Sequence, residues 1–268
     1  LQTEFVVHLG DLSEDNPAKV DYLEAREEAC AQFDRCGLKP FHVAGNMDIG
    51  DKPDLTMWSD WVTPETLNAF HDRFGQSWYS FDRKGIHFVV LNSQIMNGEL
   101  PEVKEQEEWL ESDLAASEGK RVVVFMHMPP FFVDEDEPDV GFYNSINEPA
   151  RSWITNLLRN YSVELLFTGH THFRCFNRVG ETRFYVAPST TTSRAGFYEA
   201  FSISPPTEQG RNDKPKLGFY LVRVLEKGTR VHFVRTGGET GKSSEKDTRQ
   251  RLITRTSHGL SDSPVGVL

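Results

Sequence analysis

Residues 165–172 have the sequence Leu-Leu-Phe-Thr-Gly-His-Thr-His, in which a short apolar run is followed by a glycine and two histidines. An apolar run such as Leu165–Phe167, bounded by turn-forming residues, predicts a buried strand. His170 and His172 therefore stand just beyond the carboxyl end of that strand. Because imidazole binds transition metals well, this strand end is a candidate metal site.

Three other predicted strands end in residues that can bind metal. Gly10-Asp11 follows the strand 5–9, Gly45-Asn46-Met47-Asp48 follows 41–44, and His127-Met128-Pro129 follows 121–126. Ligands of α/β sheets bind beyond the carboxyl ends of the strands, so we expect these loops to meet at one sheet edge. These four blocks offer carboxylate, amide and imidazole groups to one candidate metal site.

The remaining chain alternates between apolar runs and helical patterns, which predicts a layered α/β architecture with helices packed on sheets. Helices are expected over residues 20–36, 64–74 and 102–117 and after Pro149. Hairpins are expected over 78–91 and 219–234, the second forming another antiparallel layer. We place the domain at residues 1–236. The polar composition of residues 237–268 predicts a tail or loosely packed arm.

The composition excludes several classes of function. The chain has 268 residues, with 29 Lys and Arg against 40 Asp and Glu, and its formal charge of -11 repels nucleic-acid phosphates. It contains no run of about 18 apolar residues that would span a membrane. Its three cysteines suggest neither a disulfide framework nor a metal clip, which favours a cytoplasmic location. An exported precursor is the alternative.

The ligand types favour a particular chemistry. An aspartate carries charge and can bridge two ions, an asparagine offers a neutral oxygen, and imidazoles suit Fe, Zn, Mn or Ni. Two such ions stabilise the attacking and leaving oxygens of a displacement at phosphorus. The mixture therefore fits a two-metal hydrolase of phosphorylated substrates.

In their order along the chain, the four blocks resemble the signature of the calcineurin-like metallophosphoesterases. Leu91-Asn92-Ser93-Gln94 and Asn144-Ser145 are similar, more narrowly, to the branch containing a single calcineurin-like phosphoesterase domain. The resemblance extends from about Thr3 to Thr236. It implies an α/β/β/α sandwich and a metal-dependent phosphoesterase, in which a metal-bound hydroxide attacks a phosphomonoester or phosphodiester.

The resemblance also implies roles for single residues. Asp11 would bridge two divalent ions, Asn46, His127 and His170 would complete one metal site, and His172 would serve the other. Asp11, Asn46 and His127 are thus the expected catalytic residues, with Asn46 also binding substrate. Arg174 is the second expected substrate-binding residue, and an ordinary surface arginine is the alternative at that position.

Two departures from the family pattern stand out. The first block, Asp-x-His, is absent, which would remove two ligands of one metal site; we favour an incomplete N-terminus, lacking the first strand, over loss of the site. Met47 replaces the histidine of Gly-Asn-His-Asp that is thought to protonate the leaving group, and a thioether donates no proton. A catalytically silent binding or scaffold module is therefore the alternative to an enzyme.

Other conspicuous residues receive structural interpretations. His8 and His42 lie inside predicted strands and are expected to be packed core residues. The acidic run 134–137 is expected to be a solvated loop, with a lid that screens substrates by charge as the alternative. Phe131-Phe132 and Phe142-Tyr143 are expected to anchor loops, with the lining of a substrate pocket as the alternative.

Overall fold

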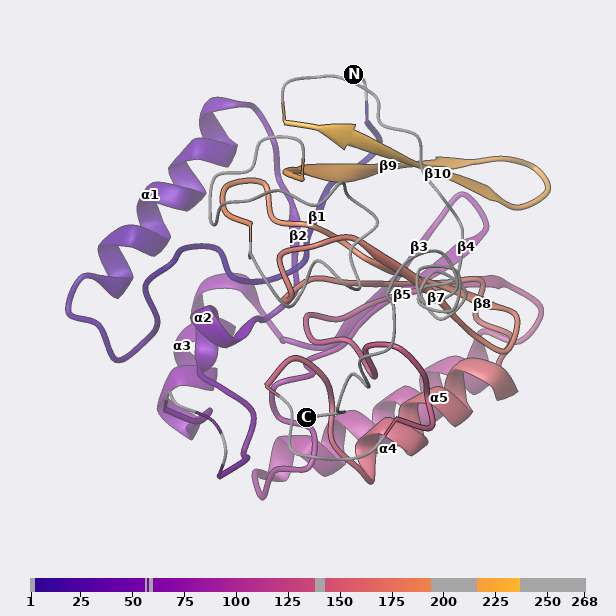
Figure 1. Cartoon of the computed structure of the whole chain (residues 1–268), viewed down its shortest axis with the longest axis horizontal. Helices are drawn as coiled ribbons and strands as arrows, with labels where there is room; N and C mark the ends of the chain where they lie inside the picture. Colours follow the sequence, from indigo (N-terminus) through magenta and orange to yellow (C-terminus); the bar gives the residue numbers. More distant parts are fainter. Residues whose placement is uncertain (1–2, 56, 58–59, 138–142, 194–215, 237–268) are drawn as a thin grey trace, which may run out of the picture.

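The structure is a computed structural model of residues 1–268, and it describes residues 3–55, 57, 60–137, 143–193 and 216–236. The predicted tail 237–268 and Phe142 lie outside the described residues. Within the described part, a six-stranded sheet packs against a second layer made of two two-stranded sheets, with helices beside both layers (Figure 1). The predicted layered α/β sandwich is confirmed.

The larger sheet has six strands in the order β3-β4-β5-β6-β8-β7. β4, β5, β6 and β8 are parallel, whereas β3 and β7 are antiparallel to their neighbours and occupy the two edges. The strands are β3 Tyr79–Arg83, β4 Ile86–Val90, β5 Arg121–Phe125, β6 Leu165–Thr168, β7 Cys175–Val179 and β8 Thr182–Val186. Of these, β7 is not among the strands expected from the sequence.

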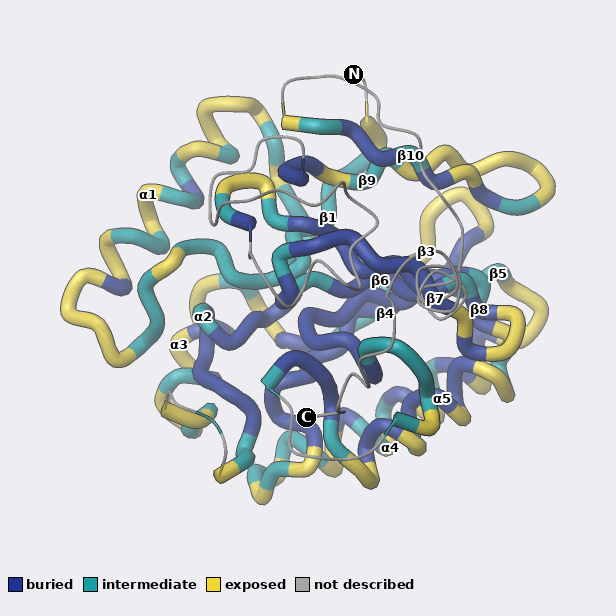
Figure 2. Tube along the Cα trace, viewed as in Figure 1, coloured by how far each residue is buried: buried dark blue, intermediate teal, exposed yellow. Residues whose placement is uncertain are grey.

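The second layer consists of two short pairs. β1 (Val7–His8) pairs in parallel with β2 (Phe41–His42), and β9 (Gly218–Val224) pairs antiparallel with β10 (Thr229–Arg235). A core cluster joins this layer to the large sheet, with members including Val43, Val90, Phe125, Phe167 and Val231. The expected second antiparallel layer is therefore present, and the central strands β4, β5, β6 and β8 of the large sheet are almost entirely buried (Figure 2).

Helices close both sides of the sandwich. α4 (Pro101–Ala116) and α5 (Ala150–Asn160) cover the outer face of the large sheet, where Ile154 and Leu158 are almost fully buried. α1 (Tyr22–Arg35) lies beside β1 and β2, and its surface is largely exposed (Figure 2). Among the described residues, none of the helices combines the length and the apolar character of a membrane-spanning segment.

Two further helices stand next to the predicted ligand loops. α2 (Asn46–Ile49) is a single turn that begins at a candidate ligand and was too short to predict from sequence periodicity. α3 (Pro64–Phe74) starts as expected, because the Thr63 hydroxyl accepts a hydrogen bond from the Thr66 amide and Pro64 occupies the first turn.

Candidate metal centre

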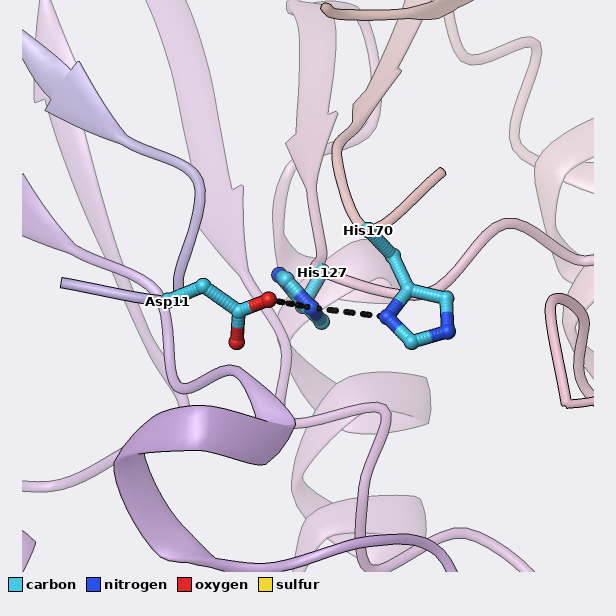
Figure 3. A group of neighbouring side chains, drawn as sticks. All are labelled: Asp11, His127 and His170. Atoms are coloured by element: carbon cyan, nitrogen blue, oxygen red, sulfur yellow. Dashed lines mark hydrogen bonds and ion pairs between the residues drawn. The ribbon is translucent and has the colours of Figure 1, made fainter. Parts of the chain in front are cut away.

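Four of the five predicted ligands lie together at the carboxyl ends of four strands. Asp11 follows β1, Asn46 follows β2, His127 follows β5 and His170 follows β6. β1 and β2 belong to the small sheet and β5 and β6 to the large one, so the prediction of a single sheet edge is wrong. The ligands instead meet where the parallel strands of both layers end (Figure 3).

The four side chains direct ligand atoms at a common point. His127 Nε2 lies 3.1 Å from His170 Nδ1, and Asn46 Oδ1 lies 3.1 and 3.0 Å from these two nitrogens. Asp11 Oδ2 lies 3.3 Å from His127 Nε2. Ligands that bind one four-coordinate ion at about 2.0 to 2.2 Å are separated by about 3.3 Å, so these distances suit a single cation.

Main-chain carbonyls orient both imidazoles. The Nδ1 of His127 lies 2.6 Å from the carbonyl oxygen of Leu9, and the Nε2 of His170 lies 3.0 Å from that of Tyr143. A carbonyl only accepts hydrogen bonds, so each of these nitrogens carries the hydrogen. In their neutral forms the two rings therefore offer lone pairs at His127 Nε2 and His170 Nδ1, the two atoms that face the shared point.

Asp48 fixes the two loops that bear Asp11 and Asn46. Its carboxylate accepts hydrogen bonds from the amides of Asp11 (2.8 Å), Gly45 (2.8 Å) and Leu12 (3.0 Å). It thus ties the loop after β1 to the start of α2. This is the supporting role that an outer carboxylate plays behind metal ligands.

The neighbouring glycines are required by close contacts. A Cβ atom at Gly10 would lie 2.4 Å from His127 Nδ1, and one at Gly45 would lie 2.4 Å from Asp11 Oδ1. Asp11 and His170 have φ angles of 58° and 66°, in the left-handed region that costs a non-glycine residue about 1–3 kcal/mol. Strain of this kind persists where the surrounding structure holds a functional group in place.

The charges of the cluster are coupled. Burial favours the neutral form of Asp11, but the adjacent His127 outweighs it and holds the pKa of this carboxyl well below its usual range. Burial also opposes the charging of His127, and the negative charge of Asp11 reverses that effect and raises the His127 pKa. Burial, followed by the charge of Asp11, raises the pKa of Asp48 to about 6.

His172 and Arg174 lie apart from this group. His172 is half-buried with a φ of 61°, and its Nδ1 is 3.2 Å from the hydroxyl of Thr192. The His, Cys, Asp and Glu ligand atoms within 4.8 Å of one another, among the described residues, come from Asp11, His127 and His170. Arg174 is only 5% exposed and its guanidinium lies 3.7 Å from the centre of the Phe233 ring, so the surface alternative is wrong.

Met47 borders the cluster at the position where the family pattern has histidine. Its amide donates to Asp11 Oδ1 at 2.9 Å, and its sulfur lies 3.6 Å from Asn46 Nδ2. The side chain is therefore next to the candidate ligands, as the resemblance to the family pattern implied. It supplies no acidic hydrogen there.

Sequence reasoning missed the contribution of Tyr143 to the site. The phenol oxygen accepts a hydrogen bond from Asn46 Nδ2 at 2.9 Å, and the Tyr143 ring centre lies 4.7 Å from that of His170. The aromatic pair that contains Tyr143 was the available signal, but it did not indicate which ligands the loop touches. The main-chain carbonyls of Leu9 and Tyr143 leave no signature in a sequence.

The acidic run is held in place by specific contacts. Glu137 accepts hydrogen bonds from the amides of Phe132 and Val133, both at 2.9 Å, and Glu135 forms an ion pair with Arg159 of α5. These side chains are half-buried. The expected solvated loop is therefore wrong for this part of the run.

A groove of about 540 Å³ lies next to the candidate metal centre and does not contain it. Its lining includes Ile49 and Gly50, at the end of α2, and Trp61 and Thr63, before α3. The four clustered ligands are not among the lining residues. The groove and the ligand cluster are therefore separate features of the surface and the interior.

Comparisons with known proteins identify a family. Residues 1–174 match the family model described as calcineurin-like phosphoesterase. The serine/threonine-protein phosphatase CPPED1 of Homo sapiens is 29% identical over 178 residues, which cover 63% of this chain and 53% of that protein. Purple acid phosphatase 22 of Arabidopsis thaliana is 28% identical over 185 residues, covering 65% of this chain and 39% of that protein. The chain thus matches about half the length, or less, of these relatives.

A solved structure supports the fold. The purple acid phosphatase from yellow lupin (Lupinus luteus) seeds superposes with a TM-score of 0.53 and 15% sequence identity, covering 88% of this chain and 45% of that one. At this level of identity the likeness concerns the architecture alone.

Proposed function

The chain belongs to the calcineurin-like phosphoesterase family, and on that premise we propose that it hydrolyses phosphate esters with divalent metal held by Asp11, Asn46, His127 and His170. The observation that carries the proposal is the convergence of two imidazole lone pairs and two side-chain oxygens at separations of 3.0 to 3.3 Å. Nitrogen and oxygen donors of this kind suit Fe, Mn, Zn or Ni.

The protein residues have distinct tasks in this proposal. Asp11 supplies negative charge. Asn46 supplies a neutral oxygen, so a bound ion would keep positive charge to attract an anionic substrate. Leu9 and Tyr143 keep the hydrogens of the two imidazoles away from the shared point. When bound, a divalent ion supplies Lewis acidity toward a phosphate ester and lowers the pKa of water.

We further propose a second ion, with Asp11 shared and His172 as one of its ligands. Support comes from the dinuclear pattern of the family and from the left-handed backbone that His172 shares with Asp11 and His170. Arg174 remains a proposed substrate-binding residue, reaching the phosphate from the segment after His172.

The proposed substrate class is a phosphorylated protein side chain. Several relatives are described as serine/threonine-protein phosphatases, and 32% identity to that of Mus musculus extends over 136 residues, 48% of this chain and 40% of the relative. We propose a cytoplasmic location, because the thiols of Cys30, Cys36 and Cys175 are all free. The acidic surface gives no reason to expect nucleic acid as a partner.

The test is hydrolysis by the metal-loaded chain. We expect release of phosphate from a phosphoserine peptide and from 4-nitrophenyl phosphate with Mn²⁺, Zn²⁺ or Fe²⁺, and at least about 10²-fold less with His127→Gln. A bis(4-nitrophenyl) phosphate assay separates diesterase from monoesterase activity. Metal binding without hydrolysis of any of these esters would favour the silent-module alternative and contradict the proposal.

A further inference from the structure

A buried lysine lies six positions after the candidate ligand Asn46, and it donates hydrogen bonds to the segment that follows Tyr143. Lys52 is 4% exposed, and its ammonium donates to the carbonyl oxygen of Ser145 and to Asn147 Oδ1, both at 2.6 Å. The nearest Asp54 oxygen is 3.9 Å away. An ammonium group that leaves water requires such partners, so these short contacts bind the segment around 145–147 firmly to Lys52.

The same segment has other fixed contacts. The Ile146 amide donates to the carbonyl of Pro129 at 2.9 Å, and Asn97 Nδ2 donates to the carbonyl of Asn147 at 2.9 Å. Asn147 also donates to Asp54. Lys52 thus supplies the cationic member of a set of contacts that define the path of residues 145–147.

This path leads directly to the ligands. Tyr143, two residues before Ser145, accepts a hydrogen bond from His170 Nε2 through its carbonyl at 3.0 Å and from Asn46 Nδ2 through its phenol oxygen at 2.9 Å. The carbonyl contact determines which nitrogen of His170 bears the hydrogen. A shift of this loop would release both ligands from their partner.

We propose that Lys52 is a positioning residue of the metal centre, acting through Ser145, Asn147 and Tyr143 on the tautomer of His170. With Lys52 in place, the Tyr143 carbonyl holds the hydrogen on Nε2 and Nδ1 remains available for a metal ion. Without its ammonium, the loop moves, the two His170 tautomers mix, and metal affinity falls. The inference rests on the metal site of the proposed function but not on its reaction.

The primary test is Lys52→Met, which keeps much of the side-chain volume and removes the charge. Imidazole ¹H–¹⁵N spectra of the metal-free protein should show His170 hydrogenated at Nε2 in the parent and a mixture of tautomers in the variant. Calorimetric titration with Zn²⁺ should show affinity lowered by about 10- to 100-fold, the range typical for the loss of an outer partner of a metal ligand.

Matched variants separate positioning from general destabilisation. Lys104→Met removes an exposed lysine of α4 and should change neither the spectrum nor the affinity. Tyr143→Phe keeps the carbonyl and should leave the His170 tautomer unchanged while Asn46 loses its acceptor. If Lys52→Met does not fold, Asn147→Ala carries the test, because it removes one of the two acceptors and should shift the tautomer in the same direction.

Two results would overturn the proposal. The first is that Lys52→Met folds and has the same His170 tautomer and the same Zn²⁺ affinity as the parent. Asn147→Ala takes its place if Lys52→Met does not fold. The second is a lowered melting temperature accompanied by unchanged affinity, which would assign Lys52 a structural role only. Both readouts are made without substrate. The His170 tautomer and the Zn²⁺ affinity can therefore be interpreted even if the chain does not hydrolyse phosphate esters.

Discussion

His127 Nε2 and His170 Nδ1 face each other across 3.1 Å, and in the neutral rings neither nitrogen carries a hydrogen. Two lone pairs at this distance repel unless a proton or a cation lies between them, and Asn46 Oδ1 adds a third acceptor at the same point. The hydrogens that would relieve the repulsion are directed to Leu9 and Tyr143. The local structure therefore disfavours an arrangement without positive charge at this point, and a proton on His127, whose pKa Asp11 raises, or a bound cation supplies that charge.

Asp48 should prove necessary for this arrangement although it is not a proposed ligand. Asp48→Asn replaces one carboxylate oxygen with an amide donor that faces the main-chain amides of Asp11, Gly45 or Leu12. Loss of one or two buried bonds should lower the free energy of unfolding by about 1–3 kcal/mol. Metal affinity should fall by about 10- to 100-fold, measured by calorimetric titration.

Asp72→Asn on the exposed face of α3 is the matched control, and it should leave both quantities at the parent values. Equal metal affinity in Asp48→Asn and Asp72→Asn would show that Asp48 does not orient the ligands.

Metal content should be uneven between the two proposed sites. The site of Asn46, His127 and His170 has its ligand atoms assembled, whereas His172 lies outside that group and the Asp-x-His block is absent from the chain. The first site should therefore fill before the one that uses Asp11 and His172. Elemental analysis after dialysis should give closer to one ion than two per chain, and two tightly held ions would mean that other residues replace the missing block.

The fold and most of the cluster were predictable because they depend on local patterns. Apolar runs such as Leu165–Phe167 form buried strands, and their carboxyl ends place the next polar residue at a sheet edge. The assignment of strands to two layers depends on packing across the core, in the cluster that contains Val43 and Phe125, which no local pattern encodes.

The parts that could not be predicted depend on single long-range contacts. Tyr143 is 97 positions from Asn46, and its carbonyl carries no residue identity. Lys52 similarly meets Ser145 across 93 positions. Glu135 and Glu137 were expected in solvent because acidic runs usually are, but partners on α5 and on nearby amides hold them.

Acid should destabilise the fold through His8 and His42, which pack as the sequence analysis expected. Burial lowers the pKa of His8 to about 3 and that of His42 to about 4. Both are neutral in the folded chain at pH 5, whereas an unfolded histidine with a pKa near 6.5 binds a proton. Stability is therefore lost as the pH falls below about 6.5, by about 2 kcal/mol per histidine between pH 7 and pH 5.

His42→Phe isolates one of these contributions. The ring of His42 packs 4.3 Å from the centre of Phe74, so an aromatic replacement can occupy the same space. Urea unfolding should show that the free energy of unfolding falls between pH 7 and pH 5 in both proteins. The fall should be smaller in His42→Phe than in the parent by about 2 kcal/mol. An equal fall in the free energy of unfolding in the parent and in His42→Phe would show that His42 is protonated equally in the folded and unfolded chain.

Met47 should make the hydrolysis rate depend strongly on the basicity of the leaving group. Its backbone contacts Asp11, so its side chain borders the cluster, and a thioether cannot protonate a departing oxygen. A nitrophenolate leaves without a proton, whereas an alkoxide does not. General acid catalysis is typically worth about 10² to 10⁴ in rate, so Met47→His should accelerate an alkyl phosphate far more than 4-nitrophenyl phosphate.

The comparison requires protein with a complete metal centre and steady-state rates for both esters across a pH series, in the parent and in Met47→His. A change in metal binding alone would scale the two rates alike, so the ratio of the accelerations isolates proton donation from metal content. Met47→Gln, a polar replacement without an acidic hydrogen, should leave that ratio unchanged. Equal acceleration of the two esters by histidine, or none for the alkyl ester, would mean that position 47 is not the place of an acid and that the proton comes from another group at the site.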